Sequence, residues 1–272
     1  MFSKVGPIRS TLLGAAVVTS VATTLLACNP PEKAKYSTGV LKYSENARRA
    51  YEDALVAFKD KNWQEAATQL REVRRRFSFS VYAPLAQLRL ADIEYEQEKW
   101  TEAITAYKGF ERENPKHGEV GWSRMRMARS YYNQISDAFL LPAQEERDQS
   151  AVVEATREIA RYVEEFPEGP QIAQMKELHA DCLARLVAHE LYVARFYMRK
   201  DRYDAALARA TYAVTKYRGS KRDVEALIVQ GEILLMLKRK QEARATFEYV
   251  VKKYPDHPQT VQARKFLDKL GP

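Results

Sequence analysis

A spacing that recurs five times along the chain constrains its fold more than any other feature. An aromatic or otherwise bulky residue is followed by alanine three positions later, and a second marked position comes 14 residues after the first. The five sets are Trp63/Ala66/Phe77, Trp100/Ala103/Asn114, Val152/Ala155/Phe166, Tyr203/Ala206/Tyr217 and Lys240/Ala243/Tyr254. Twelve residues before four of these alanines lies another small residue, namely Ala54, Ala91, Ala194 and Gly231. Small residues at both points allow two paired helices to approach closely.

This pattern predicts repeated helix pairs. Neither helix of such a pair can bury its apolar face alone, and stacking against neighbouring pairs buries it. Proline follows three of the second marks and ends a helix, because it cannot continue the backbone hydrogen-bond ladder. The spacing resembles tetratricopeptide repeats. We therefore expect an all-α, tetratricopeptide-repeat-like α-solenoid of about five helix pairs. A C-terminal capping helix is expected over 258–270, and its predicted buried side is Val261, Phe266, Leu267 and Leu270.

The middle of the chain departs from the regular spacing. Ala128 takes the small position of the third set, but 27 residues separate it from Ala155. This predicts an insertion near 137–149, where Leu141-Pro142 breaks the helical pattern. Residues 171–200 then read as one long helix. It is expected to separate the N-terminal repeats (44–169) from a C-terminal part (170–272) with repeats four and five.

The N-terminus has the pattern of an export signal. Lys4 and Arg9 precede a charge-free segment over 11–27, which is short for a membrane span. Leu25-Leu26-Ala27-Cys28 resembles the bacterial lipobox, which implies removal of 1–27 and acylation of Cys28. Residues 28–43 would then form a lipidated flexible tether. Asn29 after the cysteine implies sorting to the outer membrane, with the chain facing the periplasm. An ordinary secretory signal with an incidental cysteine is the alternative.

Composition argues against catalysis. The chain has 10 glycines and four histidines, and it shows no phosphate-binding loop and no nucleophile motif. His179 and Cys182 share one face of the long predicted helix, where a partly buried helix surface is a simpler interpretation than a metal site. We expect no catalytic residue, no cofactor and no metal. The formal charge is +8, and basic clusters such as Arg74-Arg75-Arg76 suit acidic protein partners, anionic lipid headgroups or a merely solvated surface. Export to the periplasm excludes nucleic acid as a partner.

The first helices of the N-terminal repeats carry the candidate binding residues. Their inward positions interleave aromatic rings with arginines, a combination that suits an extended peptide with a carboxylate. The predicted groove consists of Tyr51, Phe58, Tyr95, Arg126, Arg129 and Tyr132. The competing interpretation is that about half of the inward positions serve interhelix packing.

The order of these features resembles one family. The motifs are Asn62-Trp63-Gln64-Glu65-Ala66, Arg76-Phe77-Ser78-Phe79-Ser80-Val81-Tyr82, Asn114-Pro115-Lys116-His117 and Ala194-Arg195-Phe196-Tyr197, together with the lipobox, the insertion and the long helix. They resemble the BamD family, the lipoproteins of the β-barrel assembly machinery. Ser78 departs from the family's usual proline, and the basic runs are heavier.

The resemblance implies a non-enzymatic periplasmic scaffold. Its implied partners are the POTRA domains of BamA, other lipoproteins of the machinery, and the C-terminal signals of unfolded outer-membrane proteins. Arg209 falls near the position where this family contacts BamA. Two alternatives remain open at this point: a pilotin-like repeat lipoprotein that assists secretin or type IV pilus assembly, and an activator of a peptidoglycan enzyme.

Overall fold

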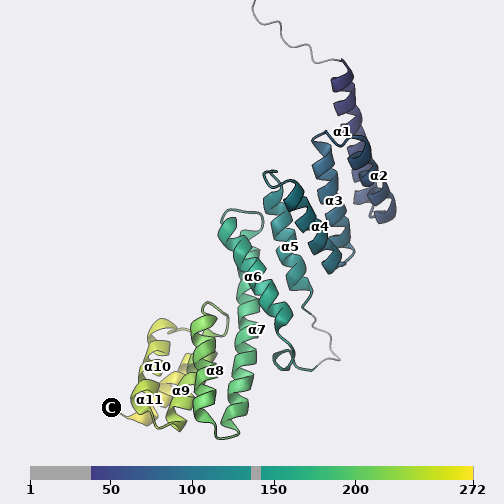
Figure 1. Cartoon of the computed structure of the whole chain (residues 1–272). Helices are drawn as coiled ribbons and strands as arrows, with labels where there is room; N and C mark the ends of the chain where they lie inside the picture. The colour runs from purple at the N-terminus through teal and green to yellow at the C-terminus, as the bar shows by residue number, and fades with distance from the viewer. Residues whose placement is uncertain (1–37, 136–141, 272) are drawn as a thin grey trace, which may run out of the picture. The chain divides into compact units, whose positions relative to one another are not determined.

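The computed structural model describes residues 38–135 and 142–271 of the 272-residue chain, and the regular elements of this part are helices (Figure 1). Residues from Lys42 onward form one compact unit. The elements are α1 (Thr38–Lys59), α2 (Trp63–Arg76), α3 (Tyr82–Glu96), α4 (Trp100–Glu113), α5 (Val120–Asn133), the short 3₁₀ helix η1 (Gln144–Glu146), α6 (Ser150–Glu165), α7 (Ile172–Met198), α8 (Tyr203–Lys216), α9 (Asp223–Met236), α10 (Lys240–Lys253) and α11 (Thr260–Leu270).

These helices form the predicted pairs. From α2 to α11, each helix packs against the next along the chain. In addition α3 contacts α5, α5 contacts α7, α7 contacts α9 and α9 contacts α11, so the first helices of successive pairs form a continuous row. The predicted all-α, tetratricopeptide-like solenoid is confirmed.

The repeated marks correspond to the ends of the second helices. Helices α2, α4, α8 and α10 begin at Trp63, Trp100, Tyr203 and Lys240, and α6 begins two residues before Val152. The second marks are the residues that cap the C-termini of these helices. The sequence spacing therefore records the length of the second helix of each pair.

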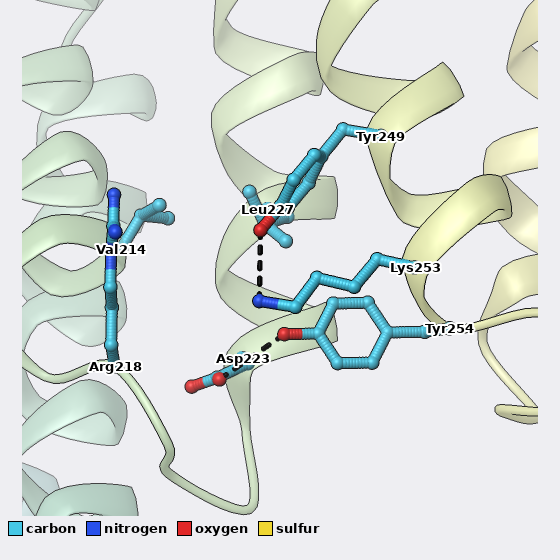
Figure 2. Close-up of a pocket in the computed structure, with 7 residues that line it drawn as sticks. All are labelled: Val214, Arg218, Asp223, Leu227, Tyr249, Lys253 and Tyr254. Atoms are coloured by element: carbon cyan, nitrogen blue, oxygen red, sulfur yellow. Dashed lines mark hydrogen bonds between the residues drawn. The ribbon is translucent and has the colours of Figure 1, made fainter.

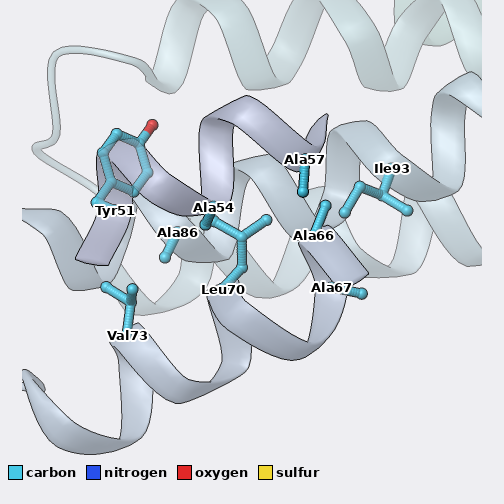
Figure 3. Close-up of a cluster of buried hydrophobic side chains, with 9 residues drawn as sticks. All are labelled: Tyr51, Ala54, Ala57, Ala66, Ala67, Leu70, Val73, Ala86 and Ile93. Atoms are coloured by element: carbon cyan, nitrogen blue, oxygen red, sulfur yellow. The ribbon is translucent and has the colours of Figure 1, made fainter. Parts of the chain in front are cut away.

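The small residues lie where the paired helices approach most closely. The five alanines of the repeat pattern in the second helices (Ala66, Ala103, Ala155, Ala206 and Ala243) are fully buried, as are Ala54, Ala91, Ala128 and Ala194 of the first helices. Figure 3 shows the first such interface, where Leu70 of α2 faces Ala54 of α1 and Ala86 of α3. Full burial of a leucine side chain contributes about 1.5–3 kcal/mol, which explains why neighbouring pairs hold together without a sheet.

Four pairs share the same tight turn between their helices. Lys61, Glu98, Asp201 and Lys238 have positive φ angles of 58°, 60°, 55° and 62°. The next residue donates its backbone N–H to a carbonyl five positions earlier, as from Asn62 to Ala57 (2.9 Å) and from Arg239 to Leu234 (2.9 Å). This is the Schellman arrangement, which usually has glycine at the left-handed position. Here four non-glycine residues adopt it, so the packing of the helix pairs outweighs the local preference.

The irregular middle contains the predicted long helix. Helix α7 runs unbroken over Ile172–Met198 and packs against both α6 and α8. The predicted insertion near 137–149 lies partly outside the described residues; its described part includes η1, which packs on α7. The division of the chain at residue 170 into two modules remains a prediction.

The capping helix corrects one expectation. In α11, Phe266, Leu267 and Leu270 pack on the core formed with α9 and α10, as predicted. Val261, predicted to be buried, is 53% exposed, and Ala263 is buried instead. The reason is helical periodicity: 263, 266, 267 and 270 share one face of a helix, whereas a residue two positions before 263 points away from it.

Candidate peptide-binding site

Arg126 on α5 is held between two aromatic rings. Its guanidinium carbon lies 4.3 Å from the ring centre of Tyr95 and 4.8 Å from that of Trp122. One terminal nitrogen donates to Glu96 Oε1 at 3.0 Å. The Arg126 side chain is only 19% exposed, so its attraction to the ring faces is poorly screened by water. Its Nε is buried and has no acceptor among the described residues, which leaves part of the guanidinium's hydrogen-bonding capacity unused. Arg126 with Tyr95, Glu96 and Trp122 is called the Arg126 cluster below.

A buried carboxylate lies beside this cluster. Asp92 on α3 is 1% exposed, and its oxygens accept hydrogen bonds from Tyr107 Oη (2.6 Å), Trp122 Nε1 (3.5 Å) and Arg89. A buried charge is costly unless it is paired and hydrogen-bonded, and these donors meet that requirement. Burial, and then the charge of Asp92, raises the pKa of Tyr107 well above its ordinary value, so its hydroxyl stays protonated as a donor. Arg89, Asp92 and Tyr107 with the shared Trp122 form the Asp92 network.

Two further predicted residues of α5 face α7. Arg129 donates to the side-chain oxygens of Gln171 (2.5 Å) and Gln174 (3.2 Å). These are neutral amides, and within the described part of the chain no carboxylate is paired with Arg129. Tyr132 Oη donates to Asp181 Oδ2 at 2.9 Å, and burial together with this carboxylate raises the pKa of Tyr132. The Arg129 guanidinium therefore keeps its positive charge available to an anionic ligand.

The two predicted residues of α1 are mainly packing residues. Tyr51 is 7% exposed and lies against Tyr82 with ring centres 5.6 Å apart. Phe58 makes an edge-to-face contact with Trp63 at 5.3 Å. Tyr51 still connects to the candidate site, because its hydroxyl interacts with Arg89 of the Asp92 network. The structure thus brings Tyr95 and Arg126 together, places Arg129 and Tyr132 on the same helix, and leaves Phe58 apart from them.

Among the residues of this site that the predicted groove omits, two are the partners of its buried or partly buried charges. Glu96 is the acid paired with Arg126, and Tyr107 is the main donor to Asp92. A signal for the second existed: Tyr107 follows Ala103 by four residues, on the buried face of α4, where a hydroxyl requires a partner.

The remaining predicted residues lie elsewhere. Arg209 on α8 is 47% exposed and pairs with the buried carboxylate of Glu190 on α7 at 3.3 Å. Cys182 is a free thiol in the core between α6 and α7, and burial raises its pKa to about 12. Burial likewise lowers the pKa of His179. Cys28 lies outside the described residues.

Two features of the described residues bear on cofactors and membranes. Over 38–135 and 142–271, His, Cys, Asp and Glu side chains form no group of three or more that could hold a metal ion. Over the same ranges, no helix has both the length and the apolar character needed to cross a bilayer.

Paired helices in this register, with buried small residues at the contact points, define a tetratricopeptide-like repeat protein. The model of the YfiO family, described as outer membrane lipoproteins, matches residues 44–248. The chain belongs to this family.

Three relatives with the same name illustrate the similarity. The chain is 25% identical over 217 residues to the outer membrane protein assembly factor BamD of Neisseria gonorrhoeae, covering 78% of this chain and 81% of that protein. It is 22% identical over 213 residues to BamD of Xylella fastidiosa strain 9a5c (76% and 72%) and 23% identical over 189 residues to BamD of Vibrio cholerae (67% and 77%). Among solved structures, the TPR2AB domain of yeast Sti1 in its pHSP90 complex matches with a TM-score of 0.43 and 12% identity over 83% of each chain.

Proposed function

We propose that this chain is a non-enzymatic periplasmic lipoprotein scaffold for the assembly of outer-membrane β-barrels. Its membership of an outer membrane lipoprotein family supports the location, and the name shared by its relatives supports the assembly role. Stacked helix pairs offer an extended surface for other chains, as this role requires. The relatives' names favour this function over the pilotin and peptidoglycan-enzyme alternatives.

The proposed ligand of the Arg126 cluster and the neighbouring Arg129 is the C-terminal signal of an unfolded outer-membrane protein. Such a signal often ends in an aromatic residue with a free carboxylate, as the family resemblance implies. One observation carries the assignment: among the described residues, Arg129, three positions after Arg126 on α5, is held by two neutral amides and by no carboxylate. The ligand's carboxylate would pair with Arg129, and its side chains would pack near Tyr95 and Trp122. Because Glu96 already neutralises Arg126, that arginine contributes mainly through the rings that it organises.

The test is peptide binding to the purified chain. The probe is a synthetic peptide from the end of a β-barrel strand, compared with the same peptide amidated at its C-terminus. Replacing Arg126 and Arg129 together with alanine should weaken binding of the free acid by about 1–3 kcal/mol, the range for lost charge-assisted hydrogen bonds. Arg129→Ala alone should remove most of the preference for the acid over the amide.

Arg157→Ala is the matched control, because Arg157 is a surface arginine of α6 paired with Glu154. It should leave both affinities unchanged. Unchanged affinity in the Arg126/Arg129 double variant would disprove the groove assignment without affecting the family.

For the C-terminal repeats we propose contact with the POTRA domains of BamA, with Arg209 at the interface. The partly exposed guanidinium reaches the surface while Glu190 fixes its position. Arg209→Glu should reduce co-purification of a BamA POTRA fragment, whereas Lys216→Glu, at the exposed end of the same helix, should not. Equal recovery with both variants would contradict this role.

The lipid anchor is proposed at Cys28. Cys28→Ala should move the chain from the membrane fraction to the soluble periplasm. If the variant remains in the membrane fraction after a high-salt wash, the acylation assignment is wrong.

A further inference from the structure

A hollow outside the Arg126 cluster opens between α8, α9 and α10. Its volume is about 70 Å³, well below the roughly 300–1,000 Å³ of small-molecule sites, so it can hold a single side-chain group rather than a whole ligand. Figure 2 shows Arg218 and Val214 on one side, Tyr249, Lys253 and Tyr254 on the other, and Leu227 with Asp223 between them. These residues are called the C-terminal hollow. Tyr249, Lys253 and Tyr254 lie beyond residues 44–248, the segment that the family model matches.

Two cations of this hollow have no acidic partner in the part of the chain that the structure describes. Lys253 Nζ lies 5.3 Å from the ring centres of both Tyr249 and Tyr254, and it donates to Tyr249 Oη at 2.9 Å. Neither Lys253 nor Arg218 forms an ion pair within the described ranges. The Tyr249 hydroxyl and the nearby Tyr254 ring therefore hold the ammonium in place without neutralising it.

The single carboxylate that lines the hollow is occupied by its own loop. Asp223 accepts from the backbone N–H of Gly219 (3.0 Å) and Ser220 (3.0 Å), from Ser220 Oγ (2.8 Å) and from Tyr254 Oη (3.3 Å). The lining thus carries two positive charges and one negative charge, a net charge of +1. That balance matches one monoanionic group, whereas a phosphate dianion would remain undercompensated.

The base of the hollow is apolar. Leu227 is buried and Val214 half-buried, and both belong to the core between α8 and α10. A ligand that fits therefore combines one carboxylate with adjacent aliphatic groups. We infer that the C-terminal hollow binds an acidic side chain of a partner protein, presented in an extended segment with a neighbouring apolar residue. This site is separate from the peptide groove, and it does not depend on the proposed assembly function.

The experiment uses the full chain in mild detergent and an immobilised peptide, acetyl-Ala-Leu-Glu-Leu-Ala-amide, with the Gln-containing analogue as reference. The wild type should bind the glutamate peptide more strongly than the glutamine peptide, and added salt should reduce the difference. Arg218→Gln and Lys253→Gln should each weaken binding of the glutamate peptide at least fivefold, and the double variant should lose the preference for glutamate.

Two controls remove the same charge just outside the hollow. Lys216→Gln lies two residues before Arg218, and Lys252→Gln precedes Lys253; both lysines are exposed. They should change affinity less than twofold. Equal weakening by all four variants would show a diffuse charge effect and overturn the site, as would the absence of any glutamate preference in the wild type. All four side chains are exposed, so the variants should fold, which circular dichroism checks.

Discussion

The second and the fifth helix pair have the same geometry, but polar contacts hold one interface and apolar contacts hold the other. Tyr107 and Phe247 occupy equivalent positions, four residues after Ala103 and Ala243, and both are fully buried. Tyr107 donates to the buried Asp92, which directly follows Ala91. Phe247 instead packs against Gly231 so closely that a Cβ on this glycine would lie 2.5 Å from the ring. One interface is held by a polar network and the other by close apolar contact.

The acid that corresponds to Asp92 in the fifth pair differs in burial and in its hydrogen-bond partner. Glu232 follows Gly231 but is only half-buried, and it accepts from Gln262 of the capping helix α11 at 2.9 Å. Burial raises the pKa of Glu232. A repeat thus tolerates an acid after its small residue in two ways: buried with a tyrosine partner, or turned toward the next helix. The first solution places charge and hydroxyl groups next to the candidate peptide site, whereas the second completes the C-terminal core.

The largest effect is expected from Asp92→Ala. Removing this carboxylate leaves the buried Tyr107 hydroxyl and the partly buried Arg89 without their acceptor, and breaking a buried pair in this way costs about 3–5 kcal/mol. The free energy of unfolding in urea measures it. Glu232→Ala is the matched variant, and a loss as large as that for Asp92→Ala would show that the two acids are not used differently.

The next largest losses of stability are expected from exchanging the two rings, Tyr107 for phenylalanine and Phe247 for tyrosine. Tyr107→Phe should destabilise the chain by about 1.5–3 kcal/mol, because it removes a hydrogen bond to a charged group. Phe247→Tyr should also destabilise it, because the added hydroxyl would meet the backbone near Gly231, where the ring is already stacked on Phe266 with centres 4.8 Å apart. Tolerance of both exchanges in urea unfolding would mean that the two interfaces are interchangeable.

Gly231→Ala tests the close approach itself. The added methyl group must displace the Phe247 ring, and such overpacking costs about 1–3 kcal/mol. Gly109→Ala is the control: a Cβ on this glycine of α4 meets nothing within 4 Å, and alanine should stabilise the helix by about 0.5–1 kcal/mol. Opposite signs for the two substitutions in thermal or urea unfolding support the comparison, and equal signs contradict it.

The sequence predicted the features that are encoded by spacing within one helix. Trp63, Trp100, Tyr203 and Lys240 start helices because the repeat length fixes where each second helix begins. Features that depend on two helices were less predictable. The pairing of Arg126 with Glu96 joins residues 30 positions apart, and the burial of Ala263 rather than Val261 depends on how α11 is rotated against α9 and α10. The left-handed turns had no sequence signal at all, since their residues are lysine, glutamate and aspartate rather than glycine.

The smallest effect on stability is expected from titration of a cysteine in the core between the two compared helix pairs. Cys182 is fully buried between α6 and α7, and its pKa is raised to about 12, compared with about 8.5 for a free cysteine. Between about pH 8.5 and 12 the native state holds the thiol proton and the unfolded state loses it. The contribution of Cys182 to the free energy of unfolding is therefore unchanged near pH 7 and falls as the pH rises from about 8.5 toward 12. In a Cys28→Ala chain, where Cys182 is the remaining thiol, a disulfide reagent at pH 8 should react slowly with the native protein and rapidly in urea. Rapid reaction of the native protein would show that α6 and α7 separate readily, which would contradict stable burial of Cys182 in this central core.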